Sequence, residues 1–242
     1  MHLNNPHDHQ PATSRPGSPD ITLIGTDDDD VLTAGRQAVN MQGLDGDDLL
    51  RGSPHDDLQL GGRGDDFLQG LGGNDTQLGG EGDDILHGDA GHDRQEGGSG
   101  DDLLFGHQGN DVLDGGAGDD VLDGGPGEDL LRGGPGDDHL AGGGGRDILL
   151  WHAQDMCGDD QISGFEPGED QIWLPLPFQP GEAQYAQVKL ESREDQSVLR
   201  IQNNERHCQI NIRFEDVDLS DGGSLSEQQA LSRLLMEGPQ AF

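Results

Sequence analysis

The sequence predicts an all-β fold built from short repeats, and three observations lead to that prediction. A nine-residue period runs without insertion from Gly25 to Leu150. Glycine contributes 42 of the 242 residues, about 17% against a usual ~7%. Acidic residues number 49 against 13 basic ones, a formal net charge of −36. These features exclude an ordinary, well-filled globular core and leave a disordered acidic chain, a glycine-rich fibre or a fold neutralised by cations.

The charge also restricts the partners of the protein. Nucleic acids and anionic membrane surfaces are polyanions, so neither is expected to bind a chain this acidic. The sequence contains no run of about 18 apolar residues, so no transmembrane helix is expected. Residues 1–20 are polar and predict a disordered leader without the apolar segment of a cleaved signal peptide. His2, His7 and His9 in this leader are either incidental or ligands for a transition metal.

The repeat comprises fourteen units, of which Gly61–Gln69 and Gly79–His87 are two examples. The eighth position is leucine in ten units. The second unit, residues 34–42, carries Val39 at the sixth position. In the other thirteen units the sixth position is aspartate: Asp30, Asp48, Asp57, Asp66, Asp75, Asp84, Asp93, Asp102, Asp111, Asp120, Asp129, Asp138 and Asp147. Solvation of an acidic surface does not require such a strict phase, so these aspartates are the candidate metal ligands.

The chemistry of the unit suits calcium. Its glycines allow positive φ and close approach of the backbone, so a tight turn can present carbonyl oxygens. Calcium is a hard cation that takes six to eight oxygen ligands from carboxylates and backbone carbonyls. The aspartate would supply the charge and the turn carbonyls would supply the remaining ligands.

The unit Gly-Gly-x-Gly-x-Asp-x-apolar-x resembles the RTX nonapeptide of hemolysin-type calcium-binding proteins. This resemblance implies a parallel β-roll, a form of β-helix solenoid, over residues 21–150, with two units in each coil. It also implies that each Ca²⁺ lies between stacked turns and is shared by aspartates eighteen residues apart, such as Asp84 and Asp102. On that basis we expect roughly eight to eleven calcium ions.

The eighth position is expected to point into the narrow core. In odd-numbered units it gives an unbroken column of leucines: Leu32, Leu50, Leu68, Leu86, Leu104, Leu122 and Leu140. In even-numbered units it gives Met41, Gln59, Gln77, Gln95, Leu113, Leu131 and Leu149. The three glutamines either bond to one another along the stack or lie where solvent reaches them.

The seventh position is expected to point outward. In odd-numbered units it is apolar from Val31 to Val121. This stripe reflects either the preference of short strands for such residues or a surface for self-association or for a partner.

After Leu150 the nonapeptide ends, and residues 151–242 predict a β-rich cap with a short C-terminal helix. Asp159–Leu174 predicts strand, turn and strand, with the turn at 166–169. This segment resembles the one that follows the repeats in many RTX proteins. Further strands are expected at 184–191, 197–202 and 207–214. A helix expected at 225–237 resembles, together with the chain end, a type I secretion signal. Cys157 and Cys208 are either bridged or free.

These features predict a secreted calcium-binding RTX protein that folds on Ca²⁺ outside the cell and acts as a structural, adhesion or surface-associated module. The type I secretion machinery is the expected export partner. No enzyme activity is expected, because the sequence lacks His-Glu-x-x-His and Gly-x-Ser-x-Gly, and only 20 residues precede the repeats. The alternative is the C-terminal calcium-binding and secretion part of a type I-secreted protease, lipase or toxin.

Overall fold

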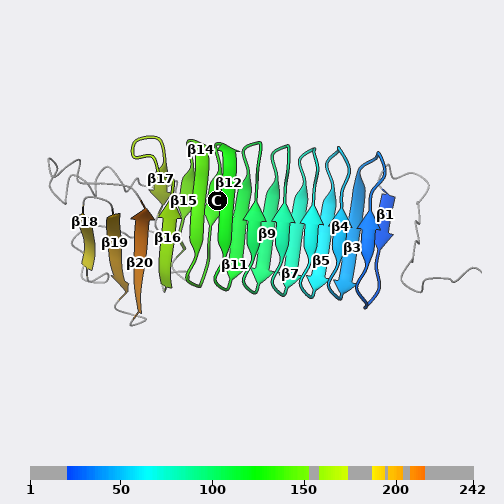
Figure 1. Cartoon of the computed structure of the whole chain (residues 1–242), viewed down its shortest axis with the longest axis horizontal. Coiled ribbons are helices and arrows are strands. Elements are labelled where there is room, and N and C mark those ends of the chain that lie inside the picture. Colours follow the sequence, from blue (N-terminus) through cyan, green and yellow to red (C-terminus); the bar gives the residue numbers. More distant parts are fainter. Residues whose placement is uncertain (1–20, 153–157, 174–186, 194–195, 204–207, 216–242) are drawn as a thin grey trace, which may run out of the picture.

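A computed structural model describes residues 21–152, 158–173, 187–193, 196–203 and 208–215. These residues form an elongated all-β solenoid of two facing sheets whose strands are parallel throughout the repeats (Figure 1). One sheet has the order β1 (Ile21–Ile24), β3 (Val39–Asp45), β5 (Leu58–Arg63), β7 (Thr76–Glu81), β9 (Arg94–Ser99), β11 (Val112–Ala117), β13 (Leu130–Arg132), β15 (Ile148–Leu150) and β17 (Gln171–Trp173). In the described part of the chain, no helix is long and apolar enough to cross a bilayer.

The second sheet begins with β2 (Val31–Thr33) and continues through β4 (Leu49–Arg51), β6 (Phe67–Gln69), β8 (Ile85–His87), β10 (Leu103–Phe105), β12 (Val121–Gly127), β14 (His139–Gly145) and β16 (Gly158–Ser163). The chain alternates between the two sheets, so each strand pairs with the strand two places before it. Leu104 accordingly lies in register between Leu86 and Leu122. Two nine-residue units therefore make one coil, and the parallel β-roll expected from the sequence is confirmed.

The core consists of the two predicted columns of position-eight side chains. The leucines of the odd units are at most 6% exposed, and Met41 and the leucines of the even units are at most 1% exposed. On the outside of the roll, Val31 is 71% exposed and Leu49 is 39% exposed. The alternation of inward position eight and outward position seven follows directly from the pleat of a strand.

The glutamines of the even column are fully buried and bond to one another. Gln77 Nε2 donates to Gln59 Oε1 at 2.7 Å, and Gln95 Nε2 donates to Gln77 Oε1 at 2.7 Å. Gln59 Nε2 completes its bonds with the backbone carbonyls of Leu50 and Gln69, each at 3.1 Å. Of the two alternatives left open by the sequence, the ladder is therefore confirmed and solvent exposure is wrong.

The C-terminal strands extend the second sheet beyond the repeats. Past β16 the sheet continues with β20 (Cys208–Glu215), β19 (Gln196–Asn203) and β18 (Gln187–Arg193). β20 pairs parallel with β16, whereas β19 and β18 are added antiparallel. All three predicted strands exist with bounds shifted by a few residues. The predicted strand–turn–strand is present as β16 and β17, with a turn in which Glu166 O accepts from Asp170 N. The expected helix at 225–237 and residues 1–20 lie outside the described residues.

Candidate metal centre

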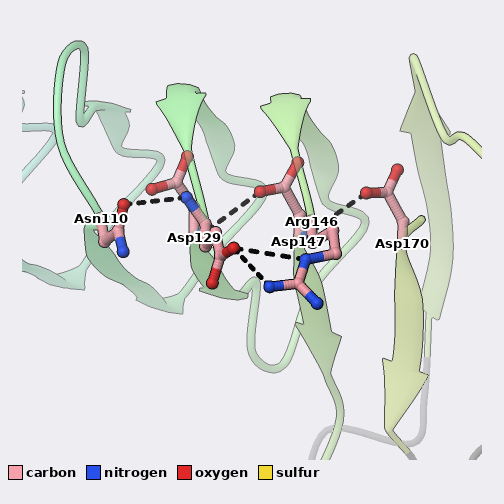
Figure 2. A network of polar contacts seen from close by, with 6 residues as sticks. Asn110, Asp129, Arg146, Asp147 and Asp170 are labelled. Atoms are coloured by element: carbon pink, nitrogen blue, oxygen red, sulfur yellow. Dashed lines mark hydrogen bonds and ion pairs between the residues drawn. The ribbon is translucent and has the colours of Figure 1, made fainter.

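The position-six aspartates form a buried ladder along each edge of the roll. From Asp48 onward, Oδ1 of each aspartate accepts a hydrogen bond from the backbone N–H of the position-six residue one coil earlier. The bond from Asp84 N to Asp102 Oδ1 measures 2.8 Å, and the bond from Asp102 N to Asp120 Oδ1 measures 2.9 Å. Figure 2 shows the same ladder on the other edge, where Asp129 donates to Asp147 and Asp147 donates to Asp170. Aspartates eighteen residues apart are thus neighbours, as the sequence predicts.

The second carboxylate oxygen distinguishes most of these aspartates from ordinary structural ones. Eleven of the thirteen have a buried Oδ2 with no hydrogen-bond partner: Asp48, Asp66, Asp75, Asp84, Asp93, Asp102, Asp111, Asp120, Asp129, Asp138 and Asp147. An unpaired carboxylate oxygen away from water is costly. Eleven such atoms, in one row on each edge, call for a cationic partner that the described residues do not provide.

At most of the position-one glycines, a backbone carbonyl oxygen lies near the unpaired carboxylate oxygen. A methyl group added to Gly97, at position one, would overlap both Asp102 Oδ2 and the carbonyl oxygen of Gly115 in the next coil. Most glycines at positions two and four take positive φ, as at Gly80 (130°) and Gly82 (129°). A methyl group at Gly80 or Gly82 would overlap the carbonyl oxygen of the equivalent residue one coil earlier. At position one, the turns therefore bring carboxylate and carbonyl oxygens together where an added methyl group does not fit.

Burial also raises the pKa of these carboxyl groups. Desolvation raises the pKa of Asp75 and Asp138 to about 8, although a backbone N–H bond to each opposes the shift. The pKa of Asp120 rises to about 7 and that of Asp102 to about 6 for the same reason. Near neutral pH the metal-free roll would therefore hold protons on carboxyl groups that a bound cation would instead stabilise in the ionised form.

The oxygen-only donor set fits calcium. Carboxylate and backbone carbonyl oxygens are the ligands that Ca²⁺ takes in proteins. Within the described residues, no three His, Cys, Asp or Glu side chains already converge as a metal cluster. Backbone carbonyls would therefore have to supply part of each shell, together with a position-six Oδ2.

Two predicted ligands differ from the other eleven. Asp30 Oδ2 accepts from the backbone N–H and hydroxyl of Thr26, at 2.5 and 2.9 Å. Asp57 Oδ2 accepts from the backbone N–H of Ser53 at 2.5 Å. Both partners occupy position two of the unit, where most coils have glycine. In the second unit Val39 is buried in the position-six slot, and its N–H still donates to Asp57 Oδ1.

Two further aspartates continue the ladders beyond the repeats and were not predicted from the sequence. Asp138 N donates to Asp160 Oδ1 at 3.2 Å, and Asp147 N donates to Asp170 Oδ1 at 3.0 Å. Their Oδ2 atoms already have protein donors, because Trp151 Nε1 donates to Asp160 Oδ2 and Glu166 N donates to Asp170 Oδ2. The signal was the pair of Asp-Gln-Ile triplets at 160–162 and 170–172, which repeat the Asp-x-apolar spacing of positions six to eight.

A second, exposed ladder runs in the opposite direction. At position five, Asp83 N donates to Asp65 Oδ1, and Asp101 N donates to Asp83 Oδ1. One edge carries aspartate at this position throughout, from Asp29 to Asp159. The other edge is mixed. There Glu128 N donates to Asn110 Oδ1, and the Glu128 carboxylate pairs with Arg146.

Comparison with known proteins agrees with this geometry. A family model described as the RTX calcium-binding nonapeptide repeat matches four times, over residues 24–58, 60–95, 96–131 and 114–149. No curated protein matches the sequence at a significant level.

Two solved structures are also similar to the chain. One is the solution structure of a subunit of the mannuronan C5-epimerase from Azotobacter vinelandii, which is 27% identical over 63% of this chain and 77% of its own length, with a TM-score of 0.35. The other is the crystal structure of an extracellular lipase from Serratia marcescens, which is 20% identical over 89% of this chain and 40% of the lipase, with a TM-score of 0.28.

Proposed function

The chain belongs to the RTX calcium-binding nonapeptide repeat family, and from this premise we propose that it is a secreted protein whose roll folds when calcium binds between its coils. The observation that carries the proposal is the set of eleven buried Oδ2 atoms without a partner. Six of them lie on one edge and form five successive pairs, and the five on the other edge form four. This count supports about nine shared ions, within the eight to eleven expected from the repeat.

Within the stacked coils, the protein's own residues shape these sites. The Oδ1 hydrogen bond fixes each carboxylate, and the position-one glycine leaves room beside its Oδ2. The bound cations would supply positive charge to a segment, 25–150, that contains thirty acidic residues and six arginines. Because the sites require stacked coils, the binding free energy becomes folding free energy.

We propose further that this coupling serves export. Where calcium is scarce, mutual repulsion and desolvation of the carboxylates would keep the repeats open, which suits passage through the type I secretion machinery. Extracellular modules bind calcium at about 10⁻⁴–10⁻³ M, so folding would follow release. Outside the cell the rigid roll would act as a structural, adhesion or surface-associated module rather than as an enzyme.

A calcium titration of the full chain tests the folding proposal. Circular dichroism should show little β-structure in chelator and a cooperative gain in millimolar Ca²⁺, with no comparable gain in Mg²⁺, which demands a stricter octahedral shell. Sedimentation in the same samples should show compaction, and would also reveal self-association. A spectrum that calcium leaves unchanged would overturn the proposal.

A further inference from the structure

The two buried aspartate ladders differ between their middle and their ends. Among the described residues, one ladder runs from Asp30 to Asp160 and the other from Asp57 to Asp170. At each of these four ends a protein donor bonds Oδ2: Thr26 N for Asp30, Ser53 N for Asp57, Trp151 Nε1 for Asp160 and Glu166 N for Asp170. The eleven aspartates between the ends all have an Oδ2 without a partner. The protein therefore satisfies this oxygen itself only where a ladder ends.

The conformation of position two separates two kinds of turn in the repeats. In all eleven units with an unpaired Oδ2, the position-two residue takes positive φ, from 69° at His107 to 133° at Gly62. Four of these residues do so although they carry a side chain: Leu44, Leu71, Asp89 and His107. Thr26 and Ser53 are not among the residues with positive φ. We call the first kind an open turn, and the second, in which the position-two N–H donates to Oδ2, a closed turn.

The side chains of the closed turns explain why these turns close. Thr26 N donates to Asp30 Oδ2 at 2.5 Å, and the Thr26 hydroxyl donates to the same atom at 2.9 Å. Ser53 N donates to Asp57 Oδ2 at 2.5 Å, and the Ser53 hydroxyl donates to Oδ1 at 3.1 Å. Serine and threonine hydroxyls favour such local bonds, and positive φ is especially rare for a β-branched residue. The residue at position two therefore selects the form of the turn.

The ends of a ladder are the places where a carboxylate lacks one stacked neighbour. An aspartate in the middle has another aspartate on both sides, so a shared cation can lie on either side of it. Asp57 instead has Val39 one coil earlier, and β20 places Ile212 opposite Asp160. A cation could neutralise an end carboxylate from one side at most. A buried carboxylate that is only partly compensated is costly, and a donor from the protein removes that cost.

We propose that position two decides which coils take calcium, so that open turns bind it and closed turns are calcium-free caps that end the ion array. This inference rests on the proposed function and adds the limits of the array to it. In a closed turn the N–H points at the oxygen that a cation would need, and it carries a partial positive charge itself. Closed turns therefore stabilise the ends of the roll by an amount that does not depend on calcium.

Counting bound ions in two matched variants tests the inference. Asp57 and Asp75 lie one coil apart on the same edge, and their Oδ1 atoms accept equivalent bonds, at 2.7 and 2.8 Å. Equilibrium dialysis of the full chain in saturating calcium should give about nine ions for the wild type. Asp75→Asn should lose one of them, because Asp75 forms one stacked pair of open turns, with Asp93. Asp57→Asn should keep every ion, although its amide faces the Ser53 N–H and lowers the melting temperature.

Ser53→Ala is a milder change that keeps the test valid if Asp57→Asn does not fold. Loss of the hydroxyl should lower the melting temperature by the same amount at every saturating calcium concentration. The slope of stability against the logarithm of the calcium concentration should stay that of the wild type, because this slope reports the number of ions bound on folding. Asp75→Asn should reduce the slope. Thermal unfolding followed by circular dichroism measures both variants.

The outcomes separate this inference from the proposed function. The inference is overturned if Asp57→Asn loses an ion as Asp75→Asn does, or if Ser53→Ala reduces the slope. In either case the wild type would still bind calcium, and the proposed function would stand. A wild-type chain that binds no calcium would overturn both, and all variants would then behave alike in the dialysis.

Discussion

Oδ1 of Asp120 accepts a 2.9 Å hydrogen bond from the backbone N–H of Asp102, one coil earlier, while its Oδ2 has no partner. One carboxylate thus ties two coils together with one oxygen and leaves the other for a cation. The structural role rests on Oδ1 and the ion-binding role on Oδ2. A substitution that keeps only the first oxygen therefore separates the two roles.

Asp120→Asn is expected to weaken calcium-dependent folding while keeping the carbonyl oxygen that bonds Asp102. The lost charge should cost about 1–3 kcal/mol in saturating calcium and raise the calcium midpoint. The matched control is Asp119→Asn, an exposed neighbour at position five, which should stay within about 0.5 kcal/mol of wild type. Calcium titrations followed by circular dichroism measure both. Equal shifts for the two variants would contradict the assignment of Asp120 as a ligand.

Gly97→Ala should damage the site without changing any charge. The added methyl group would overlap Asp102 Oδ2 and the Gly115 carbonyl oxygen. The expected result is a loss of more than about 1 kcal/mol and weaker calcium binding. Gly144→Ala is the control, because nothing lies within 4 Å of its added methyl group. Thermal unfolding in calcium compares them, and a tolerated Gly97→Ala would show that the cradle is not needed.

Low pH should partly replace calcium in stabilising the folded roll. In the roll the pKa of Asp66 and Asp84 is about 7 and that of Asp138 about 8, against an ordinary value of 3.8. A raised pKa in the folded state means that folding takes up protons, so metal-free stability falls as the pH rises from about 4 to about 8. Below pH 4 both states are protonated and the penalty disappears.

Circular dichroism in chelator from pH 4 to 8.5 measures this dependence. More β-structure is expected at pH 4.5 than at pH 8. With calcium present the dependence should reverse, because protons compete with the ions for the same carboxylates. A metal-free spectrum that is the same at both pH values would contradict the burial of these groups.

The glutamine ladder should respond non-additively to substitution. Gln77→Leu leaves Gln59 Oε1 and Gln95 Nε2 buried without their partner, at a cost of about 1–3 kcal/mol for each group. Replacing all three glutamines by leucine removes the unpaired groups and copies the opposite column. The triple variant should therefore be more stable than Gln77→Leu alone. Melting temperatures in calcium test this, and a triple variant weaker than the single one would show that the ladder contributes net stability.

The sequence predicted the repeating part of the fold because its phase is unbroken. Once two units make a coil, position eight must face inward, and Leu86 and Leu104 must stack. The phase breaks after Leu150, where the spacing from Asp138 to Asp160 becomes 22 residues. A search at intervals of eighteen residues therefore misses Asp160, although its Oδ1 accepts the same backbone hydrogen bond as the aspartates of the repeats. A pattern at position six could not show that Thr26 bonds Asp30, since that contact depends on the side chain at position two.

The two carboxylate ladders repeat the same bonds in every coil, and this repetition has a consequence for the size of the protein. Each coil contacts its neighbours through the same bonds, so nothing in a middle coil records how many coils precede it. Removing residues 115–132, one full coil, would place Asp138 next to Asp102 and Asp147 next to Asp111. Each N–H to Oδ1 hydrogen bond of the buried ladders could then form again across the new junction. Removing nine residues would instead move every later strand from its own sheet to the opposite one. β20 would then meet the wrong sheet. The length of such a rod can therefore change in evolution or by design, but only in steps of eighteen residues.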